Sequence, residues 1–132
     1  MSAPPNPAPD STATYFWLSR DGAAEAVPAE GFWSDFAELE RKANANPWLI
    51  TVYDFDADFP HWEMHPAGDE IFFAQSGDFV LTLERNGARS DHPLKGGESF
   101  LIPKGAWHFM KVNTPGRIVV VTAGKGTQHR PL

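Results

Sequence analysis

Short runs that mix β-branched and aromatic residues with polar ones fill this chain from Trp48 onward. Each run is bounded by Gly, Pro, Asp or Asn, a pattern typical of short antiparallel strands. Eight such runs occur, at residues 48–55, 61–65, 69–75, 78–84, 89–94, 98–103, 106–112 and 117–123. Because the turns between them are tight, as at Asn86-Gly87, the pattern predicts an antiparallel sandwich or barrel.

The chain before Trp48 predicts a tail and one further strand. Residues 1–13 contain four prolines and three alanines without periodicity, which predicts a flexible tail. Residues 14–20 form a β-prone run that Asp21-Gly22 closes with a turn signal. We therefore expect a single domain over residues 14–132, preceded by the tail.

One stretch, residues 34–46, has the spacing of an amphipathic helix. Ser34 is placed to cap its first turn, and Phe36, Leu39 and Ala43 recur at helical intervals. The helix is predicted to end before Pro47 and to cover one side of the barrel.

Composition narrows the range of partners and of metal ligands. The net charge is −6 and the basic residues are scattered, which argues against binding to nucleic acid. No run approaches the ~18 apolar residues of a membrane span, and no secretory signal is evident, so we expect no membrane partner and a cytoplasmic location. Because the chain has no cysteine, nitrogen and oxygen ligands must hold any metal ion.

Polar residues gather in the segment HWEMHPAGDE, residues 61–70. Side chains of a strand alternate between its faces, so Glu63 and His65 share one face with Cα atoms ~6.6 Å apart, close enough to share an ion. A turn follows, and a hairpin-like return would bring Glu70 beside His65. His61 has the same phase, but at ~13 Å from His65 it would need a sharp bend to join them.

A second segment, residues 96–113, shows a related pattern. The first segment gives E-x-H-x4-E-x6-G from Glu63, and the second gives G-x5-P-x-G-x2-H ending at His108. Together the two patterns resemble the paired motifs of the cupin superfamily over about residues 48–123. Three positions differ from the family motifs. Ala57 stands where the family has a glycine, Glu63 stands where it has the first histidine, and Val112 stands where it has a final asparagine.

The resemblance implies an all-β fold, a cupin-type jelly-roll β-barrel, here with one short N-terminal helix. It also implies that the residues at the motif positions bind one divalent metal ion, which in this chain are Glu63, His65, Glu70 and His108. Two imidazoles and two carboxylates leave such an ion nearly neutral. Oxygen ligands favour Mn or Fe, while Zn and Ni stay possible identities of the ion.

Several residues have expected roles around this ion. Glu63 or Glu70 is expected to leave the metal and transfer a proton, and is therefore a catalytic candidate. Phe72 is expected to point to the same strand face as Glu70, and Met110 to the same face as His108. Both are therefore expected to line the pocket and bind substrate. The remaining histidines, His61, His92 and His129, are expected to be exposed or to lie next to the ligands without binding the ion.

Three functions are compatible with this reading. The first is a metal-dependent enzyme of oxygenase, isomerase or hydrolase type that acts on a small polar molecule. The second is a non-catalytic cupin that binds or senses a small molecule, and the third is a metal-free, epimerase-like enzyme with His65 or His108 as base. The fold does not select among these reactions. The exposed strand edges of an open barrel, together with the size of the chain, favour a homodimer.

Overall fold

The computed structural model describes residues 10–132 and has an all-β fold with one helix. Its strands are β1 (Thr14–Leu18), β2 (Ala24–Pro28), β3 (Trp48–Phe55), β4 (His61–Met64), β5 (Glu70–Ala74), β6 (Asp78–Arg85), β7 (Ala88–Lys95), β8 (Ser99–Ile102), β9 (Trp107–Thr114), β10 (Gly116–Thr122) and β11 (Gln128–Pro131), and its helix is α1 (Phe36–Ala45). All eight runs predicted between residues 48 and 123 form strands. The expected jelly roll is confirmed.

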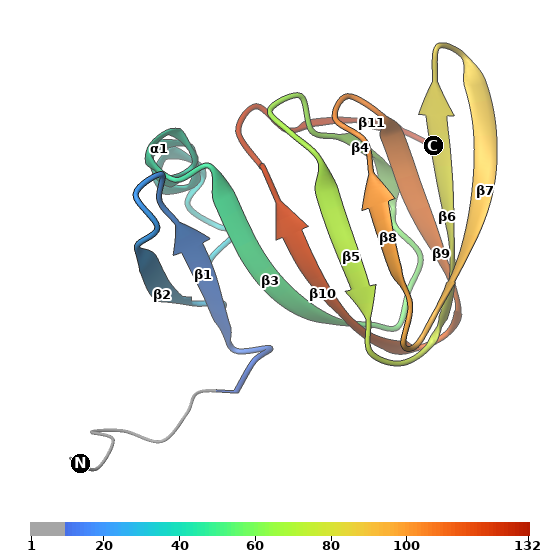
Figure 1. The fold of residues 1–132 in the computed structure, drawn as a ribbon, viewed down its shortest axis with the longest axis horizontal. Helices are drawn as coiled ribbons and strands as arrows, with labels where there is room; N and C mark the ends of the chain where they lie inside the picture. Colours follow the sequence, from blue (N-terminus) through green and yellow to red (C-terminus); the bar gives the residue numbers. More distant parts are fainter. Residues whose placement is uncertain (1–9) are drawn as a thin grey trace.

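The strands form two antiparallel sheets that face each other (Figure 1). The larger has the order β2-β1-β3-β10-β5-β8, and the smaller has the order β11-β4-β9-β6-β7. Residues with the same phase on neighbouring strands, such as Phe72, Leu81, Met110 and Ile118, point into the space between the sheets and form the main core. The candidate ligands use this same inner face.

Two strands, β2 and β11, were not predicted. The first reads AEAVP and is mostly exposed, and the second reads QHRP and ends in a proline. Each lies at the edge of its sheet, where only one side is hydrogen-bonded and apolar alternation is not required. Of these, β11 matters for the site because it pairs with β4.

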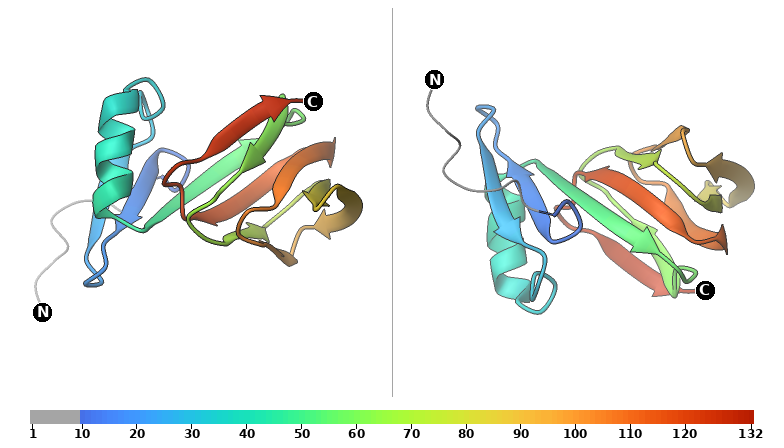
Figure 2. Two further views of the ribbon diagram at one scale, coloured as in Figure 1. Left: turned by 90° about the horizontal axis from the view of Figure 1, so that it is seen from above. Right: turned by 90° about the horizontal axis from the view of Figure 1, so that it is seen from below.

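The helix α1 lies at one end of the molecule, beside β1 and β2 and away from the β6–β7 hairpin (Figure 2). Its N-cap is Asp35, whose carboxylate accepts a hydrogen bond from the Glu38 amide at 3.1 Å. The predicted cap at Ser34 is therefore wrong, since that hydroxyl donates to the Gly31 carbonyl instead. Phe36 is 74% exposed, so the apolar face is narrower than the spacing predicted. No described helix has the length and apolar character needed to cross a membrane.

The predicted tail mostly lies outside the described residues, which begin at Asp10. From there, residues 10–13 form a turn in which the Asp10 carboxylate accepts hydrogen bonds from Thr12. The flexibility of residues 1–9 stays a prediction.

A close approach of two turns requires glycine at position 116. A Cβ atom there would lie 2.2 Å from the Ser76 carbonyl oxygen and 2.5 Å from the Gly77 Cα atom, and both are backbone atoms. We expect Gly116→Ala to lower the free energy of unfolding by about 2 kcal/mol in denaturant titrations. Gly124→Ala is the matched control, because the nearest atoms to its Cβ are 3.9 Å away. Equal stability of both variants would contradict the argument.

Candidate metal centre

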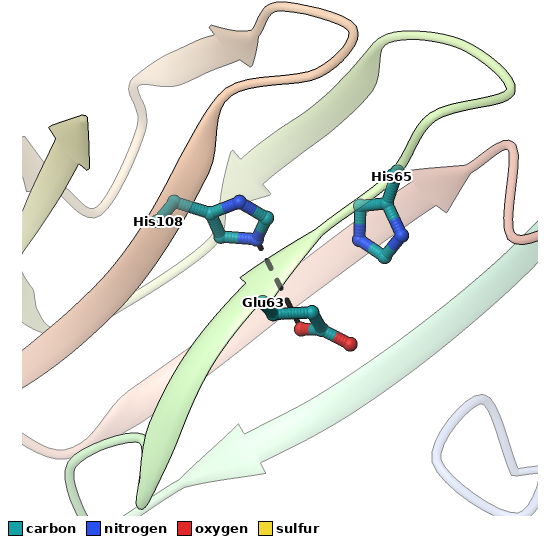
Figure 3. Close-up of side chains that lie close together, drawn as sticks. All are labelled: Glu63, His65 and His108. Atoms are coloured by element: carbon teal, nitrogen blue, oxygen red, sulfur yellow. Dashed lines mark ion pairs between the residues drawn. The ribbon is translucent and has the colours of Figure 1, made fainter. Parts of the chain in front are cut away.

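Three side chains converge on the inner face of the smaller sheet. Glu63 is on β4, His65 follows the end of that strand, and His108 is on β9 (Figure 3). One ligand atom from each lies within 4.8 Å of the other two. Because Glu63 and His108 are register partners of adjacent strands, the sheet itself brings them together. These three residues could hold a metal ion.

A fourth candidate ligand, Glu70, approaches the two imidazoles from the larger sheet, although it is outside the set whose ligand atoms all lie within 4.8 Å of one another. Its two carboxylate oxygens lie 3.1 Å from His65 Nε2 and 3.1 Å from His108 Nε2. The expected proximity to His65 is therefore present, but the expected hairpin-like return is wrong. Strands β4 and β5 belong to different sheets, so residues 66–69 carry the chain across the barrel and Glu70 faces the imidazoles from the opposite side.

Three polar atoms at this point are buried without a hydrogen-bond partner. They are His65 Nε2, His108 Nε2 and Glu70 Oε1. Leaving such atoms unpaired costs about 1–3 kcal/mol each, and native proteins seldom tolerate this. A divalent cation bound between them would satisfy all three, so the residues present fit a metal ion.

Hydrogen bonds on the far side of each ring fix which nitrogen faces the centre. The Thr127 hydroxyl donates to the Gly124 carbonyl at 2.8 Å, so its oxygen accepts from His65 Nδ1, also at 2.8 Å. His108 Nδ1 faces the Ala106 carbonyl at 3.3 Å, which can only accept. Each ring therefore keeps a proton on Nδ1 and turns Nε2 to the centre, and Nε2 is the nitrogen that would bind a metal ion once it carries no proton.

The charge of Glu70 is fixed by its surroundings. Burial raises the pKa of this carboxyl, but the contacts with His108 and His65 outweigh burial and bring the pKa to about 2. The Thr122 hydroxyl also donates to Glu70 Oε2 at 2.6 Å. Burial lowers the pKa of His65, yet Glu70 outweighs it and the net shift is upward. In the metal-free protein, protons thus compete with a cation for the same nitrogen.

Glu63 is the most exposed of the four candidates, at 27% of its side chain. One carboxylate oxygen lies 3.9 Å from His108 Nε2, and the other lies 3.4 Å from His129 Nε2. His129 is 52% exposed and its ring also meets that of His61, with centroids 4.5 Å apart. No spacing in the sequence indicated the contact between His129 and Glu63, because β11 carries no strand pattern.

The two residues expected to bind substrate lie deep in the core. Phe72 and Met110 are 2% and 0% exposed and belong to the main apolar cluster. Met110 shares the inward phase of His108 as expected. In this structure neither presents surface to a ligand, so their role in substrate binding stays a prediction.

The Thr127 hydroxyl gives a direct test of the orienting hydrogen bond. Thr127→Val keeps the shape of the side chain but removes the acceptor for His65 Nδ1. We expect the dissociation constant for Zn²⁺, measured by calorimetry, to rise about 10-fold because outer-shell partners contribute on this scale. Thr82→Val is a matched control, since that hydroxyl bonds Asp91. An unchanged dissociation constant in Thr127→Val would show that this hydrogen bond does not orient the ring.

Comparison with protein-family models decides the family. The model of the cupin domain matches residues 51–124, more than half of the chain. The chain belongs to the cupin family. The match includes all four candidate ligands of this cupin and both sequence patterns that resembled the family motifs.

Solved structures show the same fold. Hydroxypropylphosphonic acid epoxidase from S. wedmorenis aligns at 18% identity and a TM-score of 0.51, over 60% of this cupin and 44% of that chain. Peruvianin-I, a cysteine peptidase from Thevetia peruviana latex, aligns at 18% identity and a TM-score of 0.52, over 64% and 55%. This cupin thus spans about half the length of these two proteins. A cupin-2 domain protein from Shewanella frigidimarina aligns at 23% identity and a TM-score of 0.47, over 59% and 72%.

A search of curated protein sequences gave no match to this cupin. The likenesses to the epoxidase and to Peruvianin-I, both at 18% identity, show the fold alone, so the chemistry of this cupin has to be argued from its own residues.

Proposed function

We propose that this cupin binds one divalent metal ion through Glu63, His65, Glu70 and His108. The observation that carries the proposal is the set of buried polar atoms that meet at one point without a satisfied hydrogen bond: His65 Nε2, His108 Nε2 and Glu70 Oε1. Nitrogen and carboxylate oxygen suit Mn, Fe, Zn or Ni. Two carboxylates balance the charge of a divalent ion, so the buried centre would be nearly neutral.

We propose further that the centre acts on a small polar molecule that approaches from the side of Glu63. A bound divalent ion supplies Lewis acidity there and lowers the pKa of a coordinated water or hydroxyl group. Glu63 is partly exposed and its carboxylate oxygens are not fixed by a hydroxyl donor, so it is the better placed group to take up or release a proton. Glu70 is buried and bonded to Thr122, which favours a fixed ligand role.

Two surface hollows lie away from this centre. One, of about 550 Å³, is bounded by residues including Asp54 and Arg117, and another, of about 450 Å³, is bounded by residues including Trp107 and Arg130. Neither contains a candidate ligand. Neither hollow is therefore the substrate site proposed here.

The proposal is tested by the metal content of protein purified without chelator. We expect about one divalent ion per chain by elemental analysis, and a higher unfolding temperature when Mn²⁺, Fe²⁺, Ni²⁺ or Zn²⁺ is added to the stripped protein. Less than about 0.1 ion per chain with no thermal shift would refute metal binding. Turnover of a screened small molecule by stripped protein would then support the metal-free epimerase-like alternative. Ligand binding without turnover, by metal-loaded protein, would support the sensing alternative.

We also propose that this cupin is a homodimer that packs through the outer face of its larger sheet. Strand register places a continuous apolar row on that face, from Phe16 through Ile50, Val121 and Ile71 to Leu101. Leu101 is 50% exposed and Phe73, in the next row, is 45% exposed. Outer faces of antiparallel sheets are usually polar, so this apolar face favours burial against a partner.

A second copy fits this surface by charge. The two central rows carry no charged residue, so two copies of net charge −6 could meet there without burying charges. Six strands at ~4.8 Å and two uncharged rows at ~6.6 Å cover about 380 Å² of each copy, roughly half of the ~800 Å² per partner of a standard interface. The charged rows beside them would form the polar rim. Light scattering should therefore give twice 14.6 kDa, and Leu101→Lys should give 14.6 kDa. A wild-type mass of 14.6 kDa would refute the dimer.

The cytoplasmic location and the lack of a nucleic-acid partner stay predictions from the sequence.

A further inference from the structure

His129, which is not one of the candidate ligands, lies on the edge strand beside Glu63. Strand β11 pairs with β4, and β4 pairs with β9, so His129, Glu63 and His108 form one row across three strands. The two oxygens of the Glu63 carboxylate consequently face different imidazoles. One lies 3.4 Å from His129 Nε2, and the other lies 3.9 Å from His108 Nε2.

The strand that carries His129 is held firmly beside β4. The Arg130 guanidinium lies over the rings of Trp62 and Trp107, 4.9 and 4.6 Å from their centroids. It also forms an ion pair with Glu84 at 2.7 Å. These contacts fix the backbone next to His129, so its ring has a defined place even though half of it is exposed.

The Glu63 side chain is more flexible than a histidine would be, so a hydrogen-bond donor beside it would help to hold it in place for metal binding. An imidazole there would have two side-chain torsions, whereas the glutamate has three and two equivalent oxygens, so more freedom is lost when it binds an ion. Glu63 accepts no hydrogen bond from the described residues that would restrict it, although Glu70 is held by Thr122. A donor that engages one oxygen would leave the other directed at the centre.

We propose that His129 is a positioning residue that donates its Nε2 proton to one Glu63 oxygen and so directs the other oxygen to the metal. This inference rests on the proposed metal site and extends it to the C-terminal strand. A small rotation of the partly exposed ring closes the 3.4 Å contact to hydrogen-bond length. A neutral imidazole is sufficient, because only its N–H group is used. Thr127, in the same segment, gives His65 the corresponding support.

The test compares Zn²⁺ dissociation constants by calorimetry for stripped wild type, His129→Ala, His129→Gln and His92→Ala. We expect His129→Ala to bind about 10-fold more weakly. His129→Gln should stay within about 3-fold of wild type, because a glutamine amide can place an N–H group where the imidazole Nε2 stood. His92→Ala is the control for loss of a histidine, since the His92 ring contacts Ser90 of its own strand, β7, and its loss should leave affinity unchanged.

A double-mutant cycle separates positioning from other causes. In a Glu63→Ala background, adding His129→Ala should weaken binding no further, because the group to be positioned is gone. The proposal is overturned if His129→Ala binds as wild type does, if its loss persists in that background, or if His129→Gln fails to restore affinity. If wild type itself binds no Zn²⁺, the metal site fails together with this proposal. If wild type binds and the cycle fails, only the positioning role is lost.

Discussion

Replacing His108 by alanine should raise the dissociation constant for a divalent metal about 100-fold or more. His108 is fully buried and is the only candidate ligand from β9, so no exposed neighbour can take its place. The ring also lies 3.1 Å from Glu70, and its loss leaves that carboxylate with a single imidazole partner. After the loss of His108, only the His65 imidazole would remain beside the two carboxylates, so affinity should fall toward that of a site with one histidine.

The effect is measured by thermal unfolding of stripped protein with and without metal. At 100 times the dissociation constant, metal stabilises the wild type by about 2.7 kcal/mol, or about 10 °C for a domain of this size. His108→Ala should show almost no shift at that concentration, whereas His92→Ala should shift as the wild type does. A full shift in His108→Ala would place the metal somewhere else on the chain.

Replacing Glu70 by glutamine should remove a pH-dependent part of the stability of metal-free protein. The folded pKa of Glu70, about 2, lies below its ordinary value of 4.5, so its carboxylate stabilises the fold above pH 4.5 and loses this effect as the pH falls toward 2. The pKa of His65 is raised by Glu70, so its protonated form stabilises the fold below pH 6.5 and loses this effect as the pH rises through the folded pKa. The two contributions overlap between about pH 4.5 and 6.5.

Denaturant titrations of both proteins with chelator, from pH 2 to 8, give the measurement. We expect Glu70→Gln to be less stable than wild type by about 3 kcal/mol near pH 5.5. The difference should narrow at both ends of the pH range. Thr122→Val serves as the control for loss of the hydroxyl donor alone. A constant difference at every pH would mean that the charge of Glu70 does not contribute as described.

The sequence predicted the parts of this centre that depend on local geometry. Alternation along one strand put Glu63 and His65 on a common face. The turn signals before β9 identified the strand that carries His108, and the resemblance to the family motif made His108 a candidate ligand. The proximity of Glu70 to His65 was also expected, but from a hairpin-like return that the structure does not have. Periodicity therefore identified the strands and the common face of Glu63 and His65.

Features that depend on tertiary pairing could not be read from the sequence. The change of sheet between His65 and Glu70 depends on which strands pair, and the same turn residues fit a hairpin equally well. Strand β11 lies at a sheet edge and shows no apolar alternation, so its pairing with β4 could not be predicted. A place for His129 next to the ligands was one of two expectations, but the sequence did not indicate that it contacts Glu63. At the helix start, Ser34 and Asp35 are both good caps, and only the local backbone selects the second.

The most direct test of the account is an anomalous difference map from crystals of this cupin soaked or grown with Mn²⁺ or Zn²⁺. We predict one strong peak per chain within about 2.3 Å of His65 Nε2 and of His108 Nε2, with oxygens of Glu63 and Glu70 completing the contacts. A well-ordered map with no peak at these nitrogens, or with the peak on exposed carboxylates elsewhere, would contradict the proposed metal centre.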